Sequence, residues 1–332
     1  MAATEPRSVG AAGAGQTVTS AGRTREERMT GSIVVVGAPT ALGGHFAGME
    51  RTPHELRAAG MLERLAGQPA LQGMRLRDAG DVAVDPGWRA DPDPRAKNRE
   101  LIAGMLPRLA AHVSDALADG TDARLLALGG DCTAHAGVLA GLRRTRPGDR
   151  LGLAWFDAHG DSNTPDTTPS GNVWGMPFAM ACGHGDPDLL AACDAPSVRE
   201  EDAALFGGQV LDETESRRLA ASPVAHFGAG MLATEAGRAA ADGWAAVVGG
   251  RVDGLYVAFD LDALDASGGW SLAMPEIGGL SLETAAAVVA ILARRTRVVG
   301  CGATAALFRE GDDRGPTVEA IATLAAAALG RG

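Results

Sequence analysis

The chain has 332 residues, of which 46% are hydrophobic, and carries a net charge of −11 from 41 acidic and 30 basic residues. The acidic balance and the lack of a basic stripe argue against nucleic acid as a partner, and no apolar run reaches the roughly 20 residues of a membrane-spanning helix. Four cysteines are too few for a disulfide framework, so we expect reduced thiols in a soluble, cytoplasmic protein.

The first 31 residues are rich in Ala, Gly, Thr, Arg and Ser and lack the continuous apolar segment of a secretory signal. We interpret residues 1–31 as a flexible N-terminal extension. Met29 lies just before the first predicted strand, which raises the hypothesis of a start codon downstream of Met1. Residues 32–332 are predicted to form a single α/β domain.

From residue 32 onward, short apolar segments alternate with Ala- and Arg-rich segments of helical length. The predicted strands cover residues 32–37, 125–128, 151–156, 255–259 and 298–300. The predicted helices cover residues 55–66, 97–118, 134–144, 235–247, 282–294 and 316–329. Because the strands are continuously apolar, we expect a doubly wound, mostly parallel sheet with helices packed on both faces.

Side chains that can bind metals follow two of these strands. Asp157, His159 and Asp161 alternate at the end of strand 151–156, which is expected to point them to one side, and Asp260 and Asp262 follow strand 255–259. Carboxylates in this number suit a pair of divalent ions that activate water at neutral pH. The alternative is that these residues cap helices and pair with arginines.

A cysteine follows a third strand at the same edge. Cys132 comes after strand 125–128 and two glycines, which makes it a sixth candidate ligand. It could also be a small buried thiol behind the site, or a nucleophile beside a single metal. His135, one helical turn later, could supply an imidazole ligand, although a histidine on a helix surface is the commoner case.

Three segments, Gly129-Gly-Asp-Cys-Thr133, Asp157-Ala-His-Gly-Asp161 and Phe259-Asp-Leu-Asp-Ala-Leu-Asp265, resemble the signatures of the arginase/agmatinase (ureohydrolase) family. The resemblance runs from Ser32 to the C-terminus and includes Val36-Gly-Ala-Pro39, Asp78-Ala-Gly-Asp81, residues 163–172 and Gly278-Gly-Leu280. It implies a three-layer α/β/α sandwich over a catalytic domain, and a homo-oligomer, either trimer or hexamer. It also implies two Mn²⁺ ions bridged by hydroxide that hydrolyse a small guanidino substrate to urea and an amine.

Matching by position, the resemblance assigns a role to each candidate ligand. It implies that Asp157 and Asp260 bridge the two metal ions. His159 and Asp262 would complete the ligand shell of one ion, and Cys132 and Asp161 that of the other. Asp161 would also be catalytic, because it would pass a proton to the leaving amine.

The loop over residues 163–172 is similar to the arginase segment that binds a substrate α-carboxylate, which implies contacts from Asn163, Ser170 and Asn172. Asp212 is similar in position to the carboxylate that meets the α-amino group. An amino-acid substrate is therefore favoured over agmatine. These residues could also simply form a tight loop, and Asp212 and Glu215 could be solvated acids at a helix start.

Three positions depart from the family pattern. Cys132 replaces the first histidine ligand, and its thiolate adds a negative charge that weakens the metal as a Lewis acid and admits Zn²⁺, Fe²⁺ or a single ion. Trp174 replaces a proton-shuttling histidine, so it could stack on a ligand or pack in the core. Ala305 replaces the acidic residue that clamps the guanidinium, which removes a charged hydrogen bond of about 1.5–3 kcal/mol.

A less basic headgroup than guanidinium tolerates the loss of this clamp. A small branch of the family that acts on N-hydroxy-arginine is similar in having cysteine at the first ligand position. We predict a metal-dependent amidinohydrolase for a modified arginine such as N-hydroxy-L-arginine, which releases urea or hydroxyurea in secondary metabolism. The alternatives are a catalytically inactive subunit with a binding or structural role, and an agmatinase- or guanidinobutyrase-type enzyme for another linear amidine.

Overall fold

Eight strands pair in parallel to form one sheet in the described part of this computed structural model, which comprises Met1 and residues 31–84, 93, 95–118 and 122–330. Their order across the sheet is β2-β1-β3-β8-β7-β4-β5-β6. The strands are Ser32–Ala38 (β1), Arg75–Asp81 (β2), Ala123–Gly129 (β3), Leu151–Asp157 (β4), Ala203–Gly207 (β5), Ala225–Phe227 (β6), Gly254–Asp260 (β7) and Val298–Thr304 (β8). The predicted parallel sheet is therefore confirmed.

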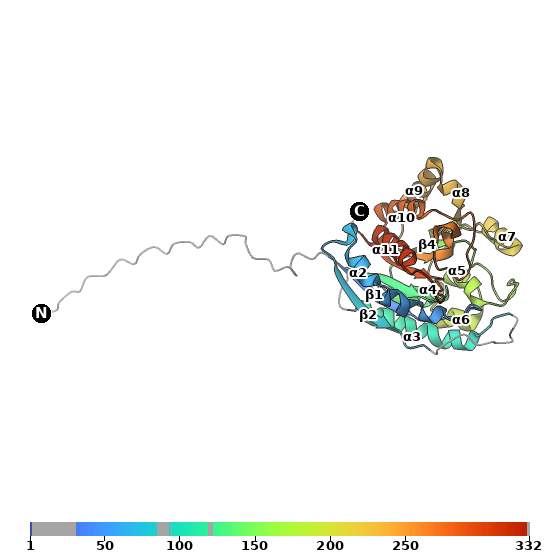
Figure 1. The fold of residues 1–332 in the computed structure, drawn as a ribbon, viewed down its shortest axis with the longest axis horizontal. Helices are drawn as coiled ribbons and strands as arrows, with labels where there is room; N and C mark the ends of the chain where they lie inside the picture. Colours follow the sequence, from blue (N-terminus) through green and yellow to red (C-terminus); the bar gives the residue numbers. More distant parts are fainter. Residues whose placement is uncertain (2–30, 85–92, 94, 119–121, 331–332) are drawn as a thin grey trace.

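Helices connect the strands and lie on both faces of the sheet (Figure 1). The α-helices of the described residues are Thr52–Ala58 (α1), Met61–Ala66 (α2), Arg99–Leu117 (α3), Ala134–Thr145 (α4), Pro177–Ala181 (α5), Pro187–Ala192 (α6), Glu213–Ala221 (α7), Ala229–Leu232 (α8), Glu235–Gly249 (α9), Leu282–Arg295 (α10) and Gly315–Leu329 (α11). Short 3-10 helices cover Met49–Arg51 (η2), Pro69–Leu71 (η3), Val173–Gly175 (η4), Glu200–Asp202 (η5), Leu261–Ala263 (η6) and Ala266–Gly268 (η7).

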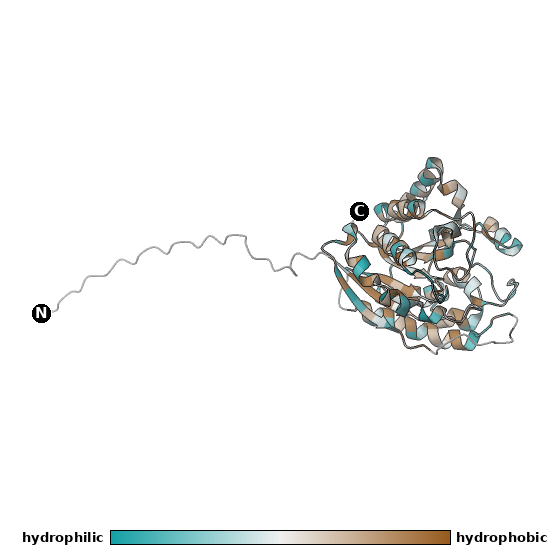
Figure 2. Ribbon diagram, viewed as in Figure 1, coloured by the Kyte–Doolittle hydropathy of each residue, from teal (hydrophilic) through white to brown (hydrophobic). Residues whose placement is uncertain are grey.

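The side chains of each central strand alternate between two hydrophobic layers. In β1, Val34 and Val36 pack with the buried residues of α3, α4, α5 and α6, whereas Ile33 and Val35 pack with those of α1, α2, α9, α10 and α11. Figure 2 shows hydrophobic strands between helices that also carry hydrophilic residues. Burial on both faces explains why the strands read as continuous apolar runs, and the predicted three-layer α/β/α sandwich is confirmed.

Two features differ from the predicted elements. The predicted helix over residues 55–66 is two helices, because Gly60 adopts a left-handed conformation with φ of 83° between α1 and α2. The strands β2, β5 and β6 are also absent from the predicted set. β2 is an edge strand that carries polar residues such as Arg75 and Asp78, and β6 has three residues. Edge and short strands lack the long apolar run that identifies a central strand.

The carboxyl ends of β3, β8, β7 and β4 are neighbours in the middle of the sheet. In doubly wound sheets, ligands bind in the crevice outside these carboxyl ends. Each predicted metal-binding segment follows one of these strands, so the topology alone brings the segments together.

Residues 2–30 lie outside the described part of the chain, so the extension over residues 1–31 stays a prediction, as does the domain boundary at residue 32. Among the helices that the structure describes, none is long and apolar enough to cross a membrane.

Candidate metal centre

Two neighbouring strands end in the central carboxylates of the site. Asp157 is the last residue of β4 and Asp260 the last of β7, and the two strands pair up to Phe156 and Phe259. These phenylalanine rings stack with centroids 4.9 Å apart below the site. Paired strands on a packed base place both carboxylates at the same height above the sheet.

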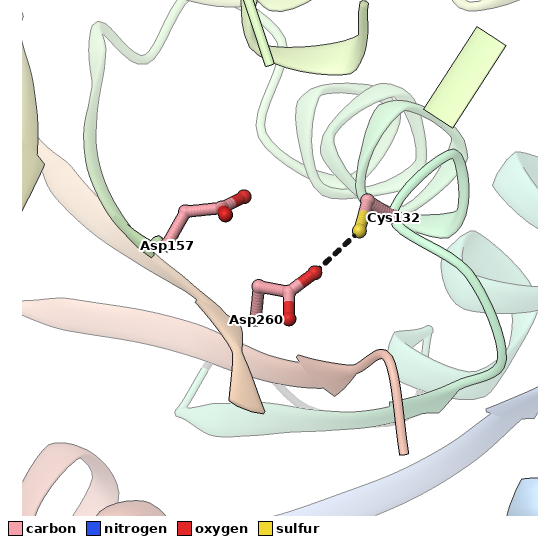
Figure 3. A group of neighbouring side chains, drawn as sticks. All are labelled: Cys132, Asp157 and Asp260. Atoms are coloured by element: carbon pink, nitrogen blue, oxygen red, sulfur yellow. Dashed lines mark hydrogen bonds between the residues drawn. The ribbon is translucent and has the colours of Figure 1, made fainter. Parts of the chain in front are cut away.

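The tight turn after β3 places Cys132 beside them. A Cβ atom at Gly130 would lie 1.9 Å from the carbonyl oxygen of Thr40, so only glycine lets the chain pass here. The thiol of Cys132 donates to Asp260 Oδ2 at 2.6 Å. Figure 3 shows the side chains of Cys132, Asp157 and Asp260 directed into one space. Their ligand atoms lie within 4.8 Å of one another, which forms a first metal-binding trio.

A second trio shares one member with the first. Ligand atoms of Asp157, His159 and Asp262 also lie within 4.8 Å of one another. His159 Nδ1 is 3.3 Å from Asp157 Oδ1 and 3.2 Å from Asp262 Oδ2. Because Asp157 belongs to both trios, the arrangement suits two adjacent ions that share a carboxylate ligand.

Asp161 reaches the site by a route other than strand alternation. β4 ends at Asp157, so the expectation that alternation along the strand orients Asp157, His159 and Asp161 is wrong for the last two. Instead the chain turns, and Asp161 adopts a left-handed φ of 44° that is strained for a residue with a side chain. Asp161 belongs to neither trio, but it lines the cavity above them, and its Oδ2 is buried without a hydrogen-bond partner among the described residues.

Burial and mutual repulsion shift the acidity of these groups. Burial, followed by the charges of neighbouring aspartates, raises the pKa of Asp161 and Asp260 well above the usual range and that of Asp262 to about 6. Burial and the same charges raise the pKa of the Cys132 thiol. Burial alone would lower the pKa of His159, but hydrogen bonds to its two carboxylate partners raise it. Without cations the ionised forms of these acids are therefore disfavoured, and bound cations would stabilise them.

The cluster meets two further requirements of a metal site. His159 Nε2 and Asp161 Oδ2 are buried polar atoms without hydrogen-bond partners in the part of the chain that the structure describes, which is costly unless a ligand engages them. The donor set of carboxylates, one imidazole and one thiolate suits divalent ions between Mn²⁺ and Zn²⁺. The residues thus fit a pair of divalent cations.

The raised pKa of Asp262 predicts how pH affects the metal-free protein. Its folded value of about 6 lies above the unfolded value of 3.8, so the folded state binds more protons between them. This stabilisation is complete below about pH 4 and is lost as the pH rises through 6. We expect the free energy of unfolding of chelator-treated protein, measured in urea, to fall from pH 5 to pH 7.5.

Asp262→Asn, which cannot ionise, is the matched control and should make this dependence shallower, while Asp161 and Asp260, whose pKa values are also raised, keep the remainder. Added Mn²⁺ should also reverse it, because metal binding favours the ionised carboxylate. Equal pH dependence in the parent and in Asp262→Asn would contradict the assignment.

A cavity of about 260 Å³ lies above the two trios. Its wall includes every residue that the sequence analysis assigned to substrate binding, namely Asn163, Ser170, Asn172, Asp212 and Trp174. Ala305, which the resemblance predicts at the position of the missing acidic clamp, also lines it. The structure therefore brings these residues to one cavity, while their contacts with a substrate remain predictions.

Asp212 in the cavity wall has two roles, one in helix capping and one in a hydrogen bond to another wall residue. Asp212 is the N-cap of α7 and forms a capping box with Glu215, as the helix-start interpretation predicted. Its Oδ2 also accepts a hydrogen bond from Asn163 Nδ2 at 2.8 Å inside the cavity. Glu215 is 5% exposed, so the expectation of a solvated acid is wrong there, and it accepts from the backbone N–H of Ser162. The capping-box spacing was the available signal for Glu215.

Behind the wall residue Asn172 lie two residues that were not predicted to belong to the site, Lys97 and His45. Asn172 Oδ1 accepts a hydrogen bond from Lys97 Nζ at 3.2 Å, and its Nδ2 lies 3.1 Å from His45 Nδ1. The His45 ring meets Trp174 edge-on, with centroids 5.1 Å apart. Burial and the positive charge of Lys97 lower the pKa of His45. No spacing links these positions in the sequence, so only the fold shows them together.

Two further side chains border the metal-binding residues. Glu276 Oε1 lies 3.8 Å from His159 Nε2, on the segment that leads into Gly278-Gly-Leu280. His135 is buried, and its Nδ1 and Nε2 lie 2.8 Å from Tyr256 Oη and 3.1 Å from Thr304 Oγ1. Because both of its ring nitrogens are engaged, His135 is not placed as a metal ligand.

The fold and the site agree with comparisons to known proteins. A model of the arginase family matches residues 31–329. Arginase of Bacillus caldovelox is 32% identical over 264 residues, which cover 79% of this chain and 86% of that protein. Arginase-1 of Homo sapiens is 30% identical over 257 residues, which cover 75% and 77%.

The structure of the Bacillus caldovelox arginase matches with a TM-score of 0.81 at 29% identity and covers 91% of this chain and 99% of that chain. The family resemblance predicted from the sequence is confirmed. The chain belongs to the arginase family and is a binuclear metallohydrolase that acts on carbon–nitrogen bonds of linear amidines.

Proposed function

We propose that this enzyme hydrolyses a modified arginine with a weakly basic headgroup, N-hydroxy-L-arginine, to hydroxyurea and the amino acid L-ornithine. The observation that carries the proposal is a cavity with two metal-binding trios at its base and an alanine, Ala305, where the guanidinium clamp is expected. The cavity thus keeps the residues for metal-assisted hydrolysis and changes those that meet the headgroup. Supply of a hydroxylated arginine suggests a role in secondary metabolism.

The two trios would hold Mn²⁺, with Asp157 shared between the ions and Asp260 as a second candidate bridge. Two divalent ions lower the pKa of water and so supply a nucleophile at neutral pH. Cys132 makes one position softer than the other, so Zn²⁺ or Fe²⁺ there, or a single ion, are the alternatives. Trp155 Nε1 donates to Asp157 Oδ2 at 2.9 Å and holds the shared carboxylate in orientation.

Asp161 is the candidate proton carrier. Its Oδ2 has no partner among the described residues and faces the cavity, and burial favours its protonated form. A carboxyl group in this state can hold a proton and deliver it to the departing amine nitrogen, which makes the amine a better leaving group. The left-handed backbone of Asp161 fixes the direction of its side chain.

The headgroup end of the cavity selects against a strongly basic guanidinium. A guanidinium in a dry pocket needs a charged acceptor, and Ala305 supplies none. An N-hydroxyguanidine has a lower pKa and brings its own hydroxyl group, so it depends less on such an acceptor. L-Arginine should therefore be the poorer substrate.

The opposite end of the cavity suits an anionic group. Asn163 and Ser170 line it, and Lys97 adds a cation behind Asn172. A substrate with a carboxylate at this end would be favoured over agmatine, which has none. Asp212, with an oxygen on the cavity side, is placed to accept from an α-ammonium group.

Substitution of Lys97 tests this polarity. Lys97→Met should raise KM for the carboxylated substrate about tenfold, because it removes the positive charge behind Asn172 that would attract the carboxylate, and should leave kcat nearly unchanged. Lys97→Arg, which keeps the charge, is the matched control. Steady-state kinetics on L-arginine analogues and on agmatine would show the effect, and an equal change for agmatine would contradict the role of Lys97.

The proposed reaction is tested by metal analysis combined with product analysis. Protein grown with Mn²⁺ should contain about two metal ions per chain and should release hydroxyurea from N-hydroxy-L-arginine much faster than urea from L-arginine. Two metals with faster release from agmatine or guanidinobutyrate would support an agmatinase-type enzyme instead. Metal-free protein without release from any of these compounds would indicate an inactive subunit.

Assembly and location follow the family in this proposal. We propose a homo-oligomer, trimeric or hexameric, which light scattering would test. The four cysteines are unpaired in the structure, in keeping with a proposed cytoplasmic location.

A further inference from the structure

A chain of buried hydrogen bonds runs behind Cys132. Thr304, the last residue of β8, has its Oγ1 3.8 Å from Cys132 Sγ and 3.1 Å from His135 Nε2. His135 Nδ1 lies 2.8 Å from the hydroxyl of Tyr256 on β7. The chain therefore links Tyr256, His135 and Thr304 to a candidate metal ligand, and all three residues are at most 1% exposed.

The surrounding residues hold this chain in place. A Cβ atom at Gly302 would lie 2.3 Å from Tyr256 Oη and 2.9 Å from His135 Cε1, so glycine makes the room that both rings occupy. Trp155 meets the His135 ring edge-on, with centroids 5.0 Å apart. The imidazole is thus fixed by two hydrogen bonds and an aromatic contact, and its position is set by the fold.

The direction of the hydrogen bonds follows from counting donors. A neutral imidazole has one N–H, and burial lowers the pKa of His135 to about 3, so the ring is neutral. Within the described residues, the Tyr256 hydroxyl has no acceptor other than His135 Nδ1. If Tyr256 donates to Nδ1, the Nε2–H donates to Thr304, whose hydroxyl hydrogen then faces Cys132. The opposite direction would leave the buried Tyr256 hydrogen without an acceptor.

We propose that Tyr256, His135 and Thr304 form a one-directional hydrogen-bond chain that presents a donor to Cys132 Sγ and tunes this cysteine as a thiolate ligand. The inference rests on the proposed role of Cys132 in metal binding. A thiolate adds a negative charge to a site already rich in carboxylates, and a donor hydroxyl offsets part of it. The three residues act on Cys132, so they are positioning residues.

Cobalt substitution of the full-length protein tests the chain. With Co²⁺ bound, ligation by Cys132 should give a sulfur-to-cobalt charge-transfer band in the near ultraviolet. A hydrogen bond to the sulfur stabilises its electrons and keeps this band at high energy. Thr304→Val keeps the shape of the side chain and removes the hydroxyl, so we expect the band to move to longer wavelength and Co²⁺ affinity to fall by about 10- to 100-fold.

Thr304→Ser, which keeps the hydroxyl, is the matched control and should retain the parent band and affinity. Tyr256→Phe removes the first donor and should move the band partway in the same direction, so it carries the test if Thr304→Val does not fold. Thermal unfolding of each variant separates a folding defect from a ligand effect.

The outcomes distinguish this inference from the proposed function. A parent band that Thr304→Val and Tyr256→Phe leave unmoved would overturn the hydrogen-bond chain while Cys132 stays a ligand. A parent protein that binds Co²⁺ without any charge-transfer band would overturn the ligand role of Cys132, and the inference with it. Turnover of N-hydroxy-L-arginine by the manganese enzyme is a separate test of the substrate. Its outcome does not depend on whether Cys132 binds the metal.

Discussion

Asp157→Asn is expected to remove both metal ions and nearly all hydrolytic activity. Asp157 is the one residue common to the two metal-binding trios, so a neutral amide there weakens both sites. Because metal ions supply several kcal/mol of transition-state stabilisation, kcat/KM should fall by at least about 10³-fold. Metal content by mass spectrometry should drop from about two ions per chain to well below one.

Two companion variants sharpen this result. Asp262→Asn disturbs only the trio formed with His159, so it should lose about one ion and keep the other. Asp122→Asn changes an acid whose side chain is 89% exposed and should keep both ions and full activity. Loss of a single ion from Asp157→Asn would show that Asp157 serves one site and would contradict the shared-ligand model.

Ala305→Glu is expected to shift the preference of the enzyme toward L-arginine. Ala305 lines the cavity, and its backbone is held by hydrogen bonds to Gly130 and Ala273. Its φ of 63° strains any residue other than glycine, so glutamate should add little backbone strain beyond that of alanine. A new carboxylate beside a guanidinium contributes about 1.5–3 kcal/mol, so kcat/KM for L-arginine should rise by about 10- to 100-fold.

Ala305→Gln separates charge from size, because glutamine has nearly the same volume without the charge. It should leave L-arginine turnover low. N-Hydroxy-L-arginine should gain less from Ala305→Glu than L-arginine does, as its headgroup is less basic. If both variants change the turnover of the two substrates in parallel, the side chain at position 305 does not select substrates by the charge of the headgroup.

Taken with the hydrogen-bond chain behind Cys132, these variants probe the metal site from both sides. The variants of Ala305, which lines the cavity, and of Lys97, which lies behind Asn172, probe the cavity side. The buried side is set by Thr304 and His135, which are hydrogen-bonded to each other and are not part of the cavity wall. Metal spectroscopy reports on the buried side, and substrate preference reports on the cavity side.

The sequence by itself determined the sheet, the layers and the metal-binding segments. Continuous apolar strands imply burial on both faces, and acidic residues that follow such strands collect at one edge of the sheet. The position of Asp157 and Asp260 directly after two such strands was therefore enough to predict that they meet. The strands β2, β5 and β6 were missed because edge strands and short strands lack a long apolar run. The break at Gly60, which divides the predicted helix over residues 55–66 into α1 and α2, was also missed.

Only the tertiary structure decided which distant side chains meet. It showed that Asp157 belongs to both trios, that a left-handed turn and not strand alternation places Asp161, and that Glu215 is buried. It also placed Lys97 behind Asn172 and joined Tyr256, His135 and Thr304 into one chain. Sequence periodicity records which face of an element is buried, whereas contacts between elements depend on register and loop path, which no local pattern encodes.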